Sequence, residues 1–150
     1  MSKNTRILVV EDSLEDFEAI KRSLGKAGLI NEMDHCDNGD DALDFLFKKG
    51  KFTEAEEPGL VLLDLNLPGV DGREILQKIK TDENLKKIPV VVLTTSNDPR
   101  DVEQCYNSGA NSYICKPVDF DGFMRSLQAL EDYWFRISIL PKDLVNDAGK

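Results

Sequence analysis

Four short apolar runs, each leading into a polar side chain, dominate the hydrophobic pattern of this chain. The runs are Ile7–Val10, Leu60–Leu63, Val90–Leu93 and Ser112–Cys115. A short run of this kind, bounded by turn residues, is typical of a strand that is buried on both faces of a sheet. The pattern therefore predicts four strands at the centre of the fold.

Segments with helical periodicity separate these runs. Ser13 can cap a helix in which Phe17 and Leu24 share one face, and Gly25 or Gly28 is expected to end it. A weaker strand is expected at 32–36, and further helices at 42–47, 75–79, 98–109 and 120–130. The polar segment 50–58 predicts a solvated loop.

Strands that alternate with helices predict an α/β fold built from βαβ units. Because such crossovers are right-handed, few topologies remain. We expect a flavodoxin-like (βα)5 fold, in which a doubly wound parallel sheet has the strand order 2-1-3-4-5.

The polar residues that follow the strands suggest a cation site. Glu11 and Asp12 follow the first run, and Asp64 follows the second. The carboxyl ends of parallel strands meet at one edge of the sheet, so these acids are expected to lie close together. Like charges at close range raise one another's pKa unless a cation neutralises them. An oxygen-only donor set favours Mg²⁺.

Two further strand ends add groups that suit phosphoryl transfer. Thr94 supplies a hydroxyl, and Lys116 supplies a mobile positive charge that can meet a carboxylate or a phosphoryl oxygen. A carboxylate held against Mg²⁺ and a lysine is a suitable nucleophile for forming an acyl phosphate. Taken singly, each residue could be a turn former, a strand residue or a surface charge. The complementary set at four strand ends favours the chemical interpretation.

Composition narrows the possible partners. The 150 residues carry a net charge of −9, which disfavours a nucleic-acid groove. No apolar run approaches the roughly 20 residues that span a bilayer, and the first residues lack a secretory signal pattern. The three cysteines do not follow disulfide or metal-ligand spacings, so we expect free thiols and a cytoplasmic protein.

The motifs resemble those of a known family. From Arg6 to about Leu130 the chain resembles the receiver domains of two-component response regulators. The resemblance rests on Val9-Val10-Glu11-Asp12, Asp64-Leu65-Asn66-Leu67-Pro68 with Asp71-Gly72, Leu93-Thr94-Thr95-Ser96 and Cys115-Lys116-Pro117. It implies a phosphoacceptor in a phosphorelay, without enzymatic activity beyond self-phosphorylation and self-dephosphorylation.

The resemblance also implies a role for each site residue. A sensor histidine kinase would phosphorylate Asp64. Asp12, Asp64 and the backbone carbonyl of Asn66 would bind Mg²⁺, and Glu11 would reach the metal through water. Thr94 and Lys116 would hold the phosphoryl oxygens. The pair Glu11-Asp12 departs from the Asp-Asp of many members, and this departure could alter the metal geometry.

A conformational switch is implied by the same resemblance. Tyr113 stands three residues before Lys116, where the family has its switch aromatic. When Thr94 moves toward the phosphoryl group, the ring would turn inward and change the face formed by the fourth helix, fifth strand and fifth helix. The alternative is that Tyr113 is an amphipathic strand residue with its hydroxyl at the surface.

The end of the chain bears on output and partners. We expect one domain over 1–150, with a core at about 6–132, a C-terminal apolar extension at 133–150 and no effector domain. The extension either packs on its own domain or forms an interaction surface. It resembles that of single-domain regulators paired with bacterial and cyanobacterial phytochromes. This resemblance implies a phytochrome kinase and a homodimer through the strand 4 to helix 5 face and the tail.

Two other functions remain as alternatives. A phosphorylation-independent scaffold would keep the fold without using the acceptor. A Mg²⁺-dependent aspartyl-phosphate phosphatase needs a second Asp two residues after its nucleophile, but Leu14 and Asn66 stand at that spacing from Asp12 and Asp64. The sequence leaves open the input signal, the downstream target, the phosphoryl lifetime and whether dimerisation depends on phosphorylation.

Overall fold

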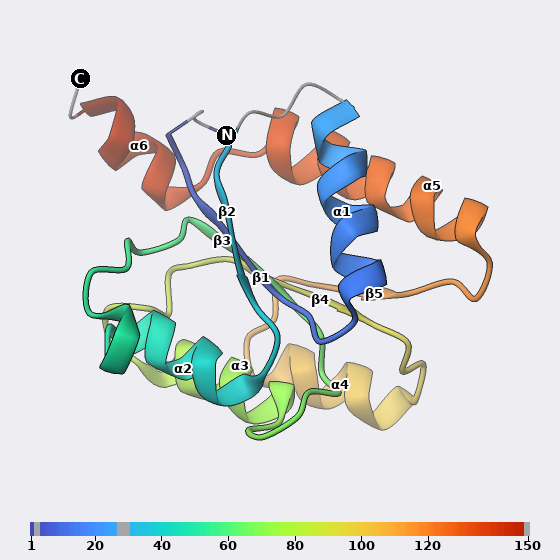
Figure 1. Cartoon of the computed structure of the whole chain (residues 1–150), viewed down its shortest axis with the longest axis horizontal. Helices are drawn as coiled ribbons and strands as arrows, with labels where there is room; N and C mark the ends of the chain where they lie inside the picture. Colours follow the sequence, from blue (N-terminus) through green and yellow to red (C-terminus); the bar gives the residue numbers. More distant parts are fainter. Residues whose placement is uncertain (2–3, 27–30, 149–150) are drawn as a thin grey trace.

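The computed structural model describes residues 1, 4–26 and 31–148, and for residues 145–148 only the backbone. Its centre is a parallel sheet with the strand order β2-β1-β3-β4-β5 (Figure 1). The strands are β1 Ile7–Val10, β2 Met33–Cys36, β3 Leu60–Leu63, β4 Val90–Thr94 and β5 Ser112–Cys115. The predicted topology and strand order are confirmed.

Helices cover both faces of the sheet (Figure 1). On one face lie α1 Leu14–Lys26 and α5 Phe120–Leu130, and on the other lie α2 Gly39–Phe47, α3 Gly72–Thr81 and α4 Pro99–Asn107. Helix α1 passes through Gly25, so this glycine does not end the helix as we predicted. Gly28, the other predicted end, lies outside the described residues.

Side-chain caps fix the helix starts. The Ser13 hydroxyl accepts a hydrogen bond from the Asp16 N–H at 3.2 Å, as the sequence predicts. The other capping side chains are those of Asn38, Asp71, Asp98 and Asp119. All these helices begin at the carboxyl edge of the sheet. The caps therefore also hold the loops that carry the polar strand-end residues.

Alternating strand residues enter two apolar cores. Leu8 and Val10 join the core beneath α2 and α3, while Ile7 and Val9 join the core beneath α1 and α5. Every residue of β1, β3 and β4 is buried. Full burial of a Leu, Ile or Val side chain contributes about 1.5–3 kcal/mol, so these central strands form a rigid base for the sheet edge. The prediction of a fourth central strand is wrong: β5 is an edge strand of the sheet, and its residues are half-buried or exposed.

The predicted loop at 50–58 is partly wrong. Lys48 ends α2 with a positive φ of 56°, and the chain then forms a short 3₁₀ helix, η1 Gly50–Phe52. The Phe52 ring lies edge-on to Phe45 with 5.4 Å between the ring centroids. This aromatic contact draws the segment onto the domain, although its other side chains are mostly polar.

The C-terminal extension continues α5 and then folds back. A π-helical segment, η2 Glu131–Ile137, leads to a helix that the sequence did not predict, α6 Pro141–Ala148. Phe135 and Leu140 are buried in the core beneath α1 and α5, so part of the extension packs on its own domain. Its exposed large apolar side chains are Tyr133, Ile137, Ile139 and Leu144.

A buried carboxylate anchors α6. Asp143 accepts hydrogen bonds from the Thr5 hydroxyl at 2.7 Å and from the Leu140 N–H at 2.8 Å.

Within the described residues, no helix has the length and apolar character needed to cross a membrane. The three cysteines are free thiols; Cys36 and Cys105 are buried and Cys115 is exposed.

Candidate functional site

The predicted acids meet at the carboxyl edge of the sheet. Glu11 and Asp12 follow β1, and Asp64 follows the neighbouring strand β3. Each of the three offers a carboxylate oxygen, and these oxygens all lie within 4.8 Å of one another. Glu11 and Asp64 are buried, whereas Asp12 is exposed. The cluster therefore opens to solvent on the side of Asp12.

Lys116 connects the acids from the end of β5. Its side chain is only 5% exposed, and its ammonium donates hydrogen bonds to three carboxylates. The acceptors are Glu11, Asp16 at 2.9 Å and Asp64 at 3.3 Å. The lysine thus reaches the predicted acceptor already in the unphosphorylated chain.

Burial and charge oppose each other in this cluster. Burial raises the pKa of Glu11 to about 7, although the hydrogen bond from Lys116 counteracts this effect. Burial lowers the pKa of Lys116, but the hydrogen bonds to Glu11 and Asp16 outweigh it, so that the pKa is raised overall. Lys116 therefore carries its positive charge at neutral pH, and this charge favours the ionised form of its acid partners.

A histidine supports the loop that holds Glu11. The His35 ring on β2 stacks on Phe17 with 3.8 Å between the centroids and an interplanar angle of 5°. The His35 Nε2 lies 2.8 Å from the backbone carbonyl oxygen of Glu11. A carbonyl only accepts, so this nitrogen carries the proton and donates.

Asn66 contacts the acid cluster, and Thr94 ends β4, the strand that pairs with β3. Thr94 is the last residue of β4, is fully buried, and its hydroxyl accepts a hydrogen bond from the Ser96 N–H at 3.4 Å. Asn66, two residues after Asp64, donates its N–H to an Asp64 carboxylate oxygen at 3.3 Å. All the residues that we predicted for the site thus belong to loops or strand ends at one edge of the sheet.

Tyr113 is linked to the loop that follows Thr94. Its hydroxyl donates a hydrogen bond to the Ser96 carbonyl at 2.9 Å, and its ring packs against the core beneath α2 and α3. The Tyr113 N–H donates to the Tyr106 hydroxyl at 3.2 Å. Tyr113 therefore bonds to the β4–α4 loop through its hydroxyl and to α4 through its backbone N–H.

Two features of the site escaped the sequence analysis. Asp16 lies in the first turn of α1, away from the strand ends from which we predicted the site, yet it accepts a hydrogen bond from Lys116. Arg73 on α3 makes a two-bond ion pair with Asp101 on α4, with both distances at 2.8 Å, and Ser96 donates to the same carboxylate at 2.6 Å. The strand-end pattern carries no signal for these residues, because Asp16, Arg73 and Asp101 lie on helices.

The donor set fits a hard divalent cation. It consists of carboxylate oxygens, and the backbone carbonyl of Asn66 is the additional ligand that the resemblance implies. Mg²⁺ prefers oxygen ligands and retains several waters, so a site that is open on the Asp12 side suits it. The cluster contains no histidine or cysteine that would favour a softer metal.

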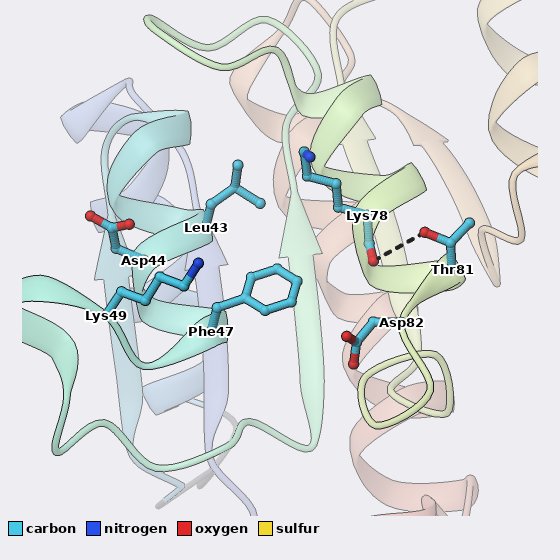
Figure 2. A pocket seen from close by; sticks show the side chains of 7 residues that line it. All are labelled: Leu43, Asp44, Phe47, Lys49, Lys78, Thr81 and Asp82. Carbon is cyan, nitrogen blue, oxygen red and sulfur yellow. Dashed lines mark hydrogen bonds between the residues drawn. The ribbon is translucent and has the colours of Figure 1, made fainter.

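A pocket elsewhere has no part in this chemistry. It lies between the C-terminal ends of α2 and α3 and has a volume of about 470 Å³ (Figure 2). Its lining residues are Leu43, Asp44, Phe47, Lys49, Lys78, Thr81 and Asp82. Since α2 and α3 lead into the amino ends of β3 and β4, this pocket is at the opposite edge of the sheet from the acids.

Comparisons with known proteins agree with this geometry. The family model of the response regulator receiver domain matches residues 7–128. Response regulator Rcp1 of Synechocystis is 38% identical over 135 residues, which cover 90% of this chain and 92% of Rcp1.

Two solved structures extend the likeness to the fold. The Mn²⁺-bound form of Rcp1 is 38% identical with a TM-score of 0.89 and covers 91% of this chain and 99% of its own. The phosphorylated cyanobacterial phytochrome response regulator RcpA is 36% identical with a TM-score of 0.88, covering 92% and 99%. These relatives are matched over nearly their whole length.

Proposed function

The chain belongs to the response regulator receiver family, and we propose that its Asp64 accepts a phosphoryl group from a sensor histidine kinase. It is a receiver-domain response regulator homologous to Rcp1 and RcpA. Receiver domains act in general as phosphoacceptors and not as enzymes. The observation that carries the proposal for Asp64 is its contact with a buried, charged Lys116 inside the acid cluster.

The proposed reaction transfers a phosphoryl group from a histidine nitrogen of the kinase to a carboxylate oxygen of Asp64. A carboxylate oxygen of Asp64 attacks the phosphorus of the donor's phosphohistidine; the O–P bond forms as the P–N bond breaks, and the histidine nitrogen leaves with the electron pair. Lys116 and Thr94 hold the phosphoryl oxygens, one by charge and one through its hydroxyl. Asp12, Asp64 and the Asn66 carbonyl would hold Mg²⁺, and Glu11 would reach it through water; the bound ion would supply positive charge against the transferring group.

The signal leaves the site through the β4–α4 loop. In this proposal Thr94 turns toward the phosphoryl group and moves Ser96 with it. Ser96 holds the Tyr113 hydroxyl, so its displacement changes the packing of that ring. The face formed by α4, β5 and α5 then has two states, and phosphorylation shifts the balance between them.

We also propose that this face forms a homodimer interface. It carries a groove of about 430 Å³ in which Tyr106 is 50% and Tyr133 is 55% exposed. The groove is lined by Tyr106, Ser112, Tyr113, Ile114, Ser126, Ala129, Leu130, Tyr133 and Trp134. Tyrosine and tryptophan are enriched at protein interfaces. Tyr133 and Trp134 come from the C-terminal extension, which would thus contribute to self-association.

The partner kinase is proposed to be a bacterial phytochrome. The support is the likeness to RcpA, whose structure is that of a phytochrome response regulator and is matched over 99% of its length. Free thiols and the histidine kinase partner are consistent with action in the cytoplasm. Neither a nucleic acid nor a membrane is required as a partner.

Intact-protein mass after incubation with acetyl phosphate and Mg²⁺ tests the acceptor assignment. We expect a gain of one phosphoryl group that is lost in Asp64→Asn and on removal of the metal. Asp121→Asn, an exposed acid in the first turn of α5, serves as the matched control and should label normally. Labelling of Asp64→Asn would overturn the assignment of Asp64, and an unlabelled wild type beside a labelled control receiver would favour a phosphorylation-independent scaffold.

A further inference from the structure

Asp16 is the one carboxylate bonded to Lys116 that lies outside the metal-binding group. Glu11 and Asp64 each belong to the acid cluster and also accept a hydrogen bond from the ammonium. Asp16 approaches the same ammonium from the first turn of α1, at 2.9 Å. Lys116 therefore bridges the acid cluster and Asp16 through hydrogen bonds.

This arrangement places Lys116 in competition with a cation. An ammonium has three donors, and all three are used by carboxylates here. Two of the acceptors, Glu11 and Asp64, have oxygens that a divalent cation needs. Every hydrogen bond that Lys116 directs to those two acids thus opposes binding of the cation, and its charge also repels a dication at short range.

Asp16 relieves this competition. It accepts one of the three hydrogen bonds, so the ammonium is shared with a carboxylate that has no place in the metal-binding group. Its negative charge also neutralises part of the Lys116 charge. Without Asp16, the ammonium would turn fully onto Glu11 and Asp64, because burial leaves it few other acceptors.

We propose that Asp16 is a positioning residue of the phosphorylation site: it holds Lys116 aside so that a divalent cation can bind while the ammonium stays within reach of Asp64. The proposal rests on the proposed function. It assigns Asp16 neither a bond to the metal nor a bond to the phosphoryl group. Asp16 acts through Lys116.

The competing explanation is an ordinary surface ion pair. The Asp16 side chain is 32% exposed, and exposed ion pairs contribute little to stability. If that explanation holds, replacing Asp16 changes the cation affinity no more than the removal of any other nearby surface charge does. The two explanations therefore differ in the dissociation constant for Mg²⁺ and not in the stability of the fold.

Calorimetric titration of the full chain with Mg²⁺ provides the test. Asp16→Asn should raise the Mg²⁺ dissociation constant about threefold to tenfold, since a charge is lost and Lys116 competes more strongly. The matched control is Glu15→Gln, which removes the same charge from an exposed neighbour on the same helical turn. It should change the dissociation constant by less than about twofold. Asp16→Glu should restore the affinity toward that of the wild type.

A second background shows whether the effect passes through Lys116. In Lys116→Met chains, Asp16→Asn should have no larger effect on the Mg²⁺ dissociation constant than Glu15→Gln. Equal affinities of Asp16→Asn and Glu15→Gln in the wild-type background would overturn the proposal, and so would an undiminished effect in Lys116→Met. Far-UV circular dichroism confirms that each variant is folded. If Asp16→Asn does not fold, the same comparison is made with Asp16→Ser.

The two proposals fail separately. The titration reports cation binding without any phosphoryl donor, so it tests Asp16 even if Asp64 is never labelled. Conversely, normal Asp64 labelling together with unchanged Mg²⁺ affinity in Asp16→Asn would leave the proposed function intact and remove the role of Asp16.

Discussion

Gly72 illustrates at the scale of a single residue how the backbone positions the acceptor. It is the first residue of α3, and its N–H donates to the Leu65 carbonyl at 2.9 Å. A Cβ at this position would lie 2.3 Å from the Asp64 carbonyl oxygen and 2.6 Å from the Leu65 Cα. Only a residue without a side chain lets the start of α3 approach the acceptor loop so closely.

Gly72→Ala is therefore expected to destabilise the protein. The new methyl group must displace backbone atoms, and overpacking of this kind costs about 1–3 kcal/mol. The change should lower the free energy of unfolding in urea and slow the labelling of Asp64 by acetyl phosphate. Gly25→Ala is the control, since nothing lies within 4 Å of a Cβ there and α1 should be unaffected or slightly stabilised. Equal stability of the two variants would contradict this account.

The sequence predicts some site residues better than others. Asp64 and Lys116 could be found because they directly follow buried strands, and parallel strands bring their ends to one edge. Asp16 could not be found in this way, since its contact with Lys116 joins residues 100 positions apart and α1 packs against α5, which follows Lys116 in the chain. Its local pattern indicates only the start of a helix. Contacts that depend on how a helix is rotated against the sheet leave no such signal.

At the scale of elements, one ion pair joins the helices on the face opposite α1. Arg73 on α3 holds Asp101 on α4, and the Ser96 hydroxyl of the β4–α4 loop donates to the same carboxylate. The hydrogen bonds from Arg73 and Ser96 lower the pKa of Asp101 to about 2. The α3–α4 contact and the loop after Thr94 thus depend on one ionised group.

This ion pair predicts a pH dependence of stability. Because the pKa of Asp101 is lower in the folded chain than its usual value of 3.8, its contribution is fully present above about pH 4. It is lost as the pH falls from about 4 toward 2, where the folded-state carboxylate takes up its proton. After allowance for solvent screening we expect a contribution of about 1 kcal/mol.

Chemical denaturation at several pH values measures this contribution. The wild type should be more stable than Asp101→Asn at pH 6, and the difference should shrink as the pH is lowered below 4. Asp121→Asn, which changes an exposed acid of α5, should show little difference at any pH. A difference between wild type and Asp101→Asn that stays constant from pH 6 to pH 3 would count against the ion pair.

Elements with regular periodicity were predictable, whereas irregular ones were not. The buried strands β1, β3 and β4 are continuous apolar runs in the sequence, and the helix 120–130 repeats its apolar residues at helical spacing. The π-helical segment η2 and helix α6 have weaker patterns, because their burial depends on a few anchors such as Phe135 and Asp143. The same holds for η1, which is fixed by the contact of Phe52 with Phe45. The conformation of these three segments is therefore determined by tertiary contacts and not by a local sequence pattern.

At the scale of the whole molecule, the acid cluster is separate from the face that we propose for self-association. The acid cluster lies at the carboxyl edge of the sheet, while the groove on α4, β5 and α5 lies along one side. Tyr113 lines that groove and also bonds to Ser96, near the buried Thr94. One side chain thus belongs both to the proposed partner face and to the loop beside the acceptor. In the proposed switch, a change at Thr94 would reach this face through Ser96 and Tyr113.

The C-terminal extension offers the last prediction, which concerns self-association. Deleting 133–150 would remove Phe135 and Leu140 from the core, so a loss of dimer could then follow from unfolding.

A surface substitution separates the loss of the interface from the loss of the fold. Tyr133→Ser should leave the fold intact and raise the dimer dissociation constant about tenfold, because an aromatic side chain would be lost from the interface. Ile139→Ser removes an apolar side chain of the same extension that does not line the groove, and it should have little effect. Sedimentation equilibrium measures both constants, and equal values for the two variants would show that the groove is not the dimer interface.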